Sequence, residues 1–240
     1  MNFFPLLIFN ARPAAGKSEI SAYVRQVPVE ERIARFHMGP IHVLDDFPIL
    51  WTWHEEDRLL ELIFQRPRLH TTPDRYFIHH DMWHLLIRRL CLDYGKWRRD
   101  EEEAHTAIME FSRGSEHGGY RAAYEHLSAT VLRQAAILYL RVSYQESQRK
   151  NRARFNPARP GSILEHGLPE AKLERLYRDD DWEEFTAGDP EYVNVGKWRL
   201  PYVVFENEDD VTTAGGPEME ERLEKAMARL WHLWQERRST

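Results

Sequence analysis

The clearest chemical signal lies near the start of the chain, where Gly16, Lys17 and Ser18 follow a turn of small residues. An apolar run over residues 6–10 precedes the turn, and a helical pattern begins at Lys17. Successive backbone N–H groups in such a turn can point at a phosphate group, and the helix N-terminus adds partial positive charge. Lys17 would reach the β- and γ-phosphates of a nucleotide, and the Ser18 hydroxyl would hold Mg²⁺.

The spacing of this turn fits the pattern GxxxxGK[ST] except at the first position, where Ala11 replaces glycine. Alanine tolerates a positive φ less well than glycine does, so we expect the turn to begin at a different angle. The segment nevertheless predicts a site for ATP and Mg²⁺. Its predicted nucleotide-binding residues are Ala11, Arg12, Pro13, Ala14, Ala15, Gly16, Lys17, Ser18 and Glu19, with Ser18 as the metal ligand.

Two carboxylates, Asp45 and Asp46, directly follow a second apolar run over residues 41–44. At the end of a buried strand, at least one of them should face the cleft above the sheet. It could accept the proton of an acceptor hydroxyl or hold a Mg²⁺-bound water, with Asp45 slightly favoured. The alternative is a cap before Pro48.

A third apolar run carries Glu110, and Arg113 follows it. A carboxylate inside such a run is costly unless it is paired. Glu110 could face Mg²⁺ and Lys17, or it could pair with Arg113. Arg113 could bind an anionic group of the substrate, or it could be an ordinary surface arginine. Both residues are candidate substrate-binding residues.

A basic cluster could supply charge to a transferring phosphoryl group. Its members are Arg149, Lys150, Arg152, Arg154 and Arg159. We expect residues 143–167 to form a lid, with Arg149 and Arg152 as catalytic residues beside Lys17, Asp45 and Asp46. The alternative is a solvated helix end, which the helix dipole favours.

Histidines gather at His79, His80 and His84. The spacing of His80 and His84 would suit one face of a helix and invites a metal interpretation. No metal motif is complete, so a structural or substrate-contacting role is favoured, and His79 and His80 are candidate residues of the acceptor pocket.

Composition limits the remaining classes. The chain has 240 residues and a net charge of −6, which does not favour nucleic acid as a partner. The only cysteine is Cys91, which excludes an intramolecular disulfide and a cysteine-based zinc site. No apolar run approaches the roughly 18 residues of a membrane span, so we expect no membrane partner and a cytoplasmic protein.

Five apolar runs alternate with helical patterns, which predicts a parallel sheet covered on both faces. The expected strands are 6–10, 41–44, 106–111, 136–140 and 202–205, and the expected helices are 17–25, 55–65, 82–93, 119–133, 143–154, 169–178 and 217–238. Residues 47–105 hold many aromatic residues and predict a helical, substrate-covering insertion, although extra helical packing is an equal alternative. The apolar stripe of 217–238 predicts a core-facing helix and leaves a homodimer contact open.

These features resemble the P-loop kinases of small molecules. The resemblance is carried by the turn ending in Gly16-Lys17-Ser18, by IHVLDDF, by TAIMEFSRG and by LYLRVSYQESQRKNRAR. It implies a three-layer α/β P-loop NTPase fold over residues 1–240, with a five-stranded parallel sheet in the order 2-3-1-4-5 and an insertion between strands 2 and 3. Ligands would lie at the carboxyl ends of the strands.

The expected activity is therefore ATP-dependent phosphate transfer to a hydroxyl or phosphate group of a small molecule. A nucleotide-binding regulator without transferase activity and a slow ATPase are the alternatives.

Overall fold

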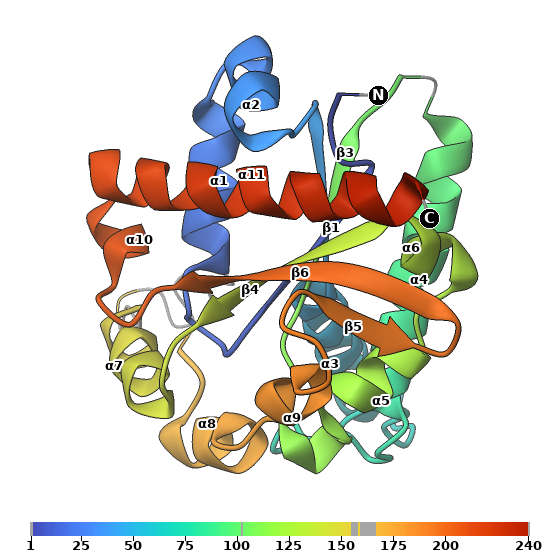
Figure 1. The fold of residues 1–240 in the computed structure, drawn as a ribbon. Coiled ribbons are helices and arrows are strands. Elements are labelled where there is room, and N and C mark those ends of the chain that lie inside the picture. Colours follow the sequence, from blue (N-terminus) through green and yellow to red (C-terminus); the bar gives the residue numbers. More distant parts are fainter. Residues whose placement is uncertain (1, 102, 155–157, 159–166, 240) are drawn as a thin grey trace.

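A computed structural model describes residues 2–101, 103–154, 158 and 167–239. It shows an α/β fold around one six-stranded sheet in the order β2-β3-β1-β4-β6-β5 (Figure 1). The strands, in sheet order, are Ile41–Asp45, Thr106–Phe111, Leu6–Ala11, Ala135–Arg141, Trp198–Glu206 and Tyr192–Val195. The first five are parallel, and β5 pairs with β6 in the antiparallel sense. With β6 as the fifth predicted strand, the expected order of the parallel strands agrees with the structure.

Helices cover both faces of the sheet. They are α1 (Lys17–Gln26), α2 (Val29–Phe36), α3 (Asp46–Leu62), α4 (Met82–Asp100), α5 (Gly119–Glu125), α6 (Ala129–Gln134), α7 (Tyr144–Arg154), α8 (Glu170–Tyr177), α9 (Trp182–Thr186), α10 (Val211–Ala214) and α11 (Gly216–Ser239). A short 3₁₀ turn, Ser115–His117, follows β3.

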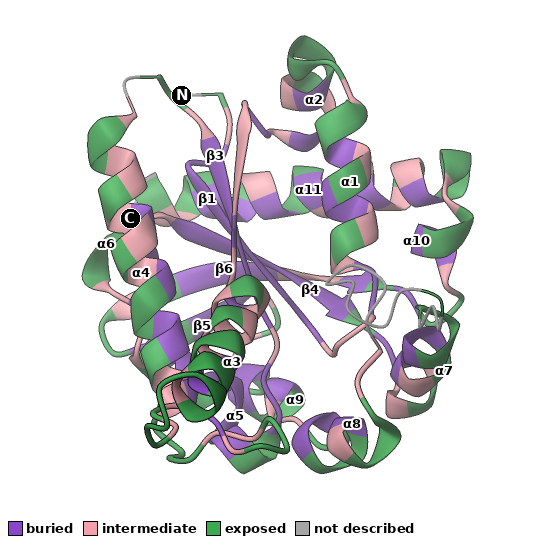
Figure 2. Cartoon of the chain, turned by 180° about the vertical axis from the view of Figure 1, so that it is seen from behind, coloured by how far each residue is buried: buried purple, intermediate pink, exposed green. Residues whose placement is uncertain are grey.

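The alternation of side chains along β1 explains the two layers of helices. Leu7 and Phe9 join the apolar cluster under α1 and α11, whereas Leu6 and Ile8 join the cluster under α4 and α5. Figure 1 shows α11 running across one face of the sheet, and Figure 2 shows the buried strands from the other side. Because both faces are covered, the strands are continuous apolar runs, as the sequence indicated.

The sixth strand corrects an expectation. Only five strands were expected, but β5 occupies Tyr192–Val195 and forms a hairpin with β6. Gly196 lies in the turn with a φ of 56°, which glycine adopts at little cost. The hairpin closes the edge of the sheet beyond the parallel strands.

The helices also differ from expectation in several places. The predicted helix 119–133 is two helices, because Ser128 caps the start of α6 by accepting a hydrogen bond from the N–H of Val131. The predicted helix 55–65 begins nine residues earlier, at Asp46, because Asp45 caps α3. Helices α2, α9 and α10 were not predicted.

The segment between β2 and β3 contains α3, an irregular loop and α4. Trp83 and Leu86 of α4 pack against Leu173, Leu176 and Tyr177 of α8, forming a third apolar cluster apart from the two under the sheet. The outer side of α3 is largely exposed in Figure 2. This segment and α8 therefore share an apolar interior of their own.

Candidate functional site

The turn after β1, which we call the phosphate loop after its predicted role, has a left-handed backbone at two positions. Ala14 has a φ of 58° and Gly16 a φ of 109°. Ala11 ends β1 beside Leu140 of β4 and is not among the described residues with a positive φ. Glycine is therefore not required at Ala11, and the left-handed backbone lies at Ala14 and Gly16 instead.

Side chains behind the loop hold its carbonyl groups. The Ser147 hydroxyl donates to the Pro13 carbonyl at 2.7 Å, and Asn207 Nδ2 donates to the Ala15 carbonyl at 2.9 Å. A Cβ on Gly16 would lie 2.5 Å from Thr212 Oγ1, so this position has room only for glycine. Among the described residues, the amides from Ala14 to Lys17 donate to no acceptor, which suits an anion cradle at the start of α1.

Lys17 projects from the first turn of α1 into a cavity of about 130 Å³ at the carboxyl ends of the strands. Its Nζ donates to Ser112 Oγ at 2.8 Å. Burial lowers the pKa of Lys17, and the carboxylates of Glu110, Asp45 and Asp46 oppose that shift. The cavity therefore brings one cation of the phosphate loop together with three acidic groups.

Asp45 and Asp46 both line this cavity. Asp45 Oδ1 also accepts a hydrogen bond from the N–H of Phe47 at 3.0 Å, so the residue caps α3 and faces the cavity at once. Burial and the neighbouring Asp46 raise the pKa of Asp45 to about 7. The two adjacent carboxylates thus have different environments, because Asp46 has an arginine partner and Asp45 does not.

Glu110 of β3 is buried and faces Lys17 rather than Arg113. Its Oε1 accepts from the Ser21 hydroxyl at 2.6 Å, and burial raises its pKa while Lys17 opposes the shift. Glu110 lines the same cavity. The alternative of a structural pair between Glu110 and Arg113 does not match this geometry.

Arg113 is buried at 2 % exposure and pairs with Asp46 Oδ2 at 2.7 Å. It also donates to the Trp83 carbonyl at 3.2 Å, and its guanidinium lies over the rings of Trp83 and Phe111. It does not line the cavity. The placement differs from a free anion-binding arginine, because its donors already serve a carboxylate and two carbonyl groups.

The arginines of α7 differ in whether they line the cavity. Arg149 pairs with Glu146 and Asp210, Arg152 pairs with Glu170, and neither lines the cavity. Arg154, from the same helix, does line it. Arg159 lies outside the described residues, as do residues 155–157 and 160–166 of the expected lid.

His79 and His80 are exposed. Neither lines this cavity or the second cavity described below. His80 contacts the Glu116 carbonyl, and His84 stacks on His126. The described residues contain no group of three or more His, Cys, Asp or Glu side chains placed to hold a metal ion. Arg12, from the phosphate loop, pairs with Asp180 away from the cavity.

The sequence interpretation missed four polar residues around the phosphate loop: Ser21, Ser112, Asn207 and Thr212. Ser21 lies one helical turn after Lys17, a spacing that could have drawn attention to it. Ser112 directly follows Glu110 and Phe111 at the end of β3. Asn207 directly follows β6 and Thr212 lies in α10, and no motif marks them.

A second cavity of about 220 Å³ adjoins the first. Both cavities are lined by Phe47, Leu50, Trp83, Leu168 and Tyr177. The second one extends under the loop between α3 and α4, where Trp51, Tyr76 and Phe77 add aromatic walls. We call the first the phosphate-loop cavity and the second the aromatic cavity.

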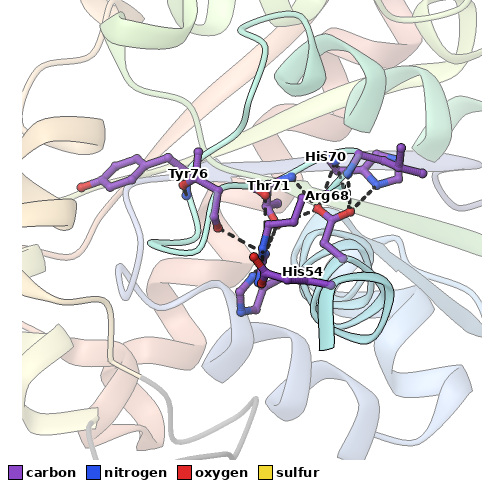
Figure 3. Close-up of polar contacts among 9 residues, drawn as sticks. His54, Arg68, His70, Thr71 and Tyr76 are labelled. Carbon is purple, nitrogen blue, oxygen red and sulfur yellow. Dashed lines mark hydrogen bonds and ion pairs between the residues drawn. The ribbon is translucent and has the colours of Figure 1, made fainter. Parts of the chain in front are cut away.

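Buried Asp57 of α3 holds the loop over the aromatic cavity. Its carboxylate accepts hydrogen bonds from the N–H groups of Leu69, His70 and Thr71 and from the Thr71 hydroxyl. His54 also contacts that hydroxyl. Figure 3 shows these contacts around Thr71, with the Tyr76 ring extending away from them. Asp57 therefore holds the loop together with Arg68, which donates to the carbonyl groups of Thr71 and Thr72.

The sheet order, the helices between β2 and β3 and the loop after β1 are consistent with a P-loop kinase fold. Among solved structures, a gluconokinase from Sinorhizobium meliloti matches with a TM-score of 0.44 and 14% sequence identity, covering 98% of this chain and 96% of that one. No protein-family model and no curated protein sequence matches the chain. No helix in the described part of the chain is long and apolar enough to cross a membrane.

Proposed function

We propose that the protein is an ATP-dependent phosphotransferase whose acceptor is a hydroxyl or phosphate group of a small molecule. The observation that carries the proposal is that Lys17 of the phosphate loop and Asp45 at the end of β2 line one cavity. Phosphoryl transfer needs cations and amides around the phosphates and a group that receives the acceptor's proton. The phosphate-loop cavity offers both.

The residues present fit a bound nucleoside triphosphate. The amides from Ala14 to Lys17 and the start of α1 would hold the phosphates, with Lys17 at the β- and γ-phosphates. Ser18 is exposed at the rim of the cavity and would be the protein ligand of Mg²⁺, which usually keeps several waters and binds phosphate oxygens. Bound Mg²⁺ would neutralise charge that develops on those oxygens.

Asp45 is the proposed base when the acceptor is a hydroxyl. The acceptor oxygen attacks the γ-phosphorus, the bond to the β–γ bridging oxygen breaks, and the hydroxyl proton moves to the Asp45 carboxylate. A pKa of about 7 suits this task, since a base works best near the operating pH. Asp46, paired with Arg113, would stay a fixed acceptor beside it.

Arg154 would supply further positive charge to the phosphates from α7, because it lines the cavity. Arg149 and Arg152 would need to leave their present carboxylate partners to do so. Arg154 is therefore the preferred cation of this helix in the proposal.

The test is an assay of ADP formation from Mg²⁺-ATP, with and without a panel of hydroxyl-bearing and phosphate-bearing small molecules. We expect acceptor-dependent ADP formation that Lys17→Ala lowers by about 10²- to 10³-fold. Lys225→Ala on the exposed side of α11 is the matched control and should leave the rate unchanged. ADP formation independent of any acceptor would favour the ATPase alternative, and binding without consumption would favour the regulator.

A further inference from the structure

We propose that the aromatic cavity is the acceptor subsite and that it takes a planar aromatic molecule bearing a carboxylate or another anionic group. This inference rests on the proposed phosphotransferase function. It concerns residues of α3, the following loop and α8, none of which belongs to the phosphate loop.

The position of the cavity assigns it to the acceptor. It joins the phosphate-loop cavity along a shared wall that includes Phe47, Trp83 and Tyr177. Phe47 follows Asp45 and Asp46 directly in the chain. A molecule lying in the aromatic cavity could therefore extend a hydroxyl past this wall toward Asp45.

The walls favour a flat ring. Phe77 and Trp83 pack edge to face at 4.7 Å between ring centroids, and Trp51 and Tyr76 line the same space. Aromatic rings prefer edge-to-face or offset contacts with one another, and such contacts add to the burial of apolar surface. A saturated ring of the same size would lose these contacts.

Two cations at the cavity lack carboxylate partners. Arg75 and Lys172 both line it, and neither forms an ion pair within the described part of the chain. The Arg75 guanidinium lies over the Trp51 ring at 5.1 Å, and Lys172 Nζ lies 4.4 Å from the centre of the Tyr76 ring. Lys172 Nζ also donates to the carbonyl groups of Asp74 and Arg75, which hold it at the cavity but leave its charge without a carboxylate.

The local electrostatics support an anion there. Burial lowers the pKa of Lys172 to about 8, and the neighbouring Arg75 adds to the shift while Asp74 opposes it. A bound carboxylate would relieve this repulsion between cations. Among the described residues that line the aromatic cavity, Asp74 is the only carboxylate.

The experiment measures binding of three probes to the full-length protein by quenching of tryptophan fluorescence, since Trp51 and Trp83 line the cavity. The probes are 4-(hydroxymethyl)benzoate, its neutral methyl ester and trans-4-(hydroxymethyl)cyclohexanecarboxylate. We expect the benzoate to bind at least about tenfold more tightly than either of the others. Equal binding of acid and ester would overturn the anionic part, and equal binding of the saturated acid would overturn the aromatic part.

The substitution Lys172→Gln tests whether Lys172 contacts the anionic group of the probe. It should weaken binding of the benzoate by about tenfold and leave binding of the ester within twofold. The matched control is Lys197→Gln, because Lys197 also lies over an aromatic ring, that of Trp198, but in the β5–β6 hairpin. If Lys172→Gln fails to fold, Arg75→Gln takes its place. An equal loss for acid and ester in the variant would contradict the assignment.

Mg²⁺-ATP binding, measured separately by calorimetry, separates this inference from the function on which it rests. Binding of ATP without selective binding of the benzoate would overturn the inference and leave the phosphotransferase standing. Selective binding of the benzoate without any binding of ATP would contradict the phosphotransferase instead. Lys17→Ala should lose ATP binding and keep benzoate binding.

Discussion

The two adjoining cavities are built in different ways. The phosphate-loop cavity is formed by groups at the ends of β1, β2 and β3, and Lys17, Asp45 and Glu110 give it charge. The aromatic cavity is formed by α3, the loop after it and α8, and rings give it shape. In the phosphate-loop cavity, the order of the strands sets the positions of the side chains. In the aromatic cavity, these positions follow from side-chain packing and from one buried carboxylate.

Because of this difference, the transfer chemistry and the binding of the acceptor would be controlled by separate parts of the molecule. β1 and β3 are hydrogen-bonded to a strand on each side, and β2 is hydrogen-bonded to β3, so the side chains at their ends keep fixed distances. The loop over the aromatic cavity has one isolated β-bridge, Thr71 to Phe77, and is also held by hydrogen bonds to side chains, among which Asp57 accepts from three successive N–H groups. Substitutions should therefore separate transfer chemistry from acceptor binding.

The largest effect should come from Asp45→Asn, at the junction of the two cavities. Loss of the proposed base should lower the rate of transfer to a hydroxyl by about 10²- to 10⁴-fold with little change in nucleotide affinity. The wild-type rate should rise with pH until about pH 7 and then level off, because the ionised carboxylate is the active form. Steady-state rates between pH 5 and 9 test this, and a flat profile would remove Asp45 from the role.

The same substitution should stabilise the fold at high pH. The folded pKa of about 7 lies above the ordinary value of 3.8, so the stability that Asp45 contributes is complete below about pH 4 and is lost as the pH rises through 7. Asn keeps the cap on α3 without the buried charge. Asp45→Asn should gain on the order of 1–3 kcal/mol at pH 8 and nothing at pH 4, measured by urea unfolding.

Arg113→Gln should destabilise the fold and thereby disturb both cavities. The substitution leaves Asp46 as an unpaired buried carboxylate and removes the contact with the Trp83 carbonyl, in the wall that both cavities share. Breaking such a pair costs about 3–5 kcal/mol. Thermal unfolding should show the loss. A fully stable variant with weaker acceptor binding alone would instead support the role of Arg113 as an anion-binding residue.

Asp57→Ala should affect the aromatic cavity alone. It leaves the amides of Leu69, His70 and Thr71 without their acceptor, and each buried orphan costs about 1–3 kcal/mol unless water replaces the partner. Amide exchange in the loop should accelerate, and the KM for the acceptor should rise with little change in the KM for ATP. Equal changes in both KM values would show that the two cavities are not separable.

The smallest effect should come from Gly16→Ala, which affects the phosphate loop alone. The added Cβ meets Thr212 Oγ1 and Asn207 Nδ2, and the φ of 109° is unfavourable for alanine, so ATP affinity should fall and stability should drop by about 1–2 kcal/mol. Gly95→Ala is the control, since a Cβ there meets nothing within 4 Å inside α4. It should gain about 1 kcal/mol, and matching losses in both variants would contradict the packing described at Gly16.

The sequence predicted the parts of this molecule that local pattern determines. Continuous apolar runs located the five parallel strands, and the pattern around Lys17 located β1, the loop after it and the start of α1. The antiparallel strand β5 was missed because its four residues resemble a connection until Gly196 turns the chain. The early start of α3 was missed because Asp45 serves as both the end of a strand and a helix cap.

Contacts between distant segments were beyond the sequence. Nothing near Arg113 indicates that it pairs with Asp46, which lies 67 positions earlier in the chain. Likewise, Asn207 contacts the phosphate loop from 192 positions away. The sequence predicted that residues 47–105 cover the substrate, but it did not predict the aromatic cavity, because part of the lining comes from α8. Such pairs are set by how the layers pack, which no short pattern encodes.

The most direct test of the account is the binding of a non-hydrolysable ATP analogue with Mg²⁺, measured by calorimetry for the wild type and for Lys17→Ala. We expect saturable binding at one site per chain and at least about tenfold weaker binding in the variant, with an unchanged thermal unfolding temperature. Equal binding by both proteins, or none by the wild type, would contradict the claim that the loop before α1 holds a nucleotide.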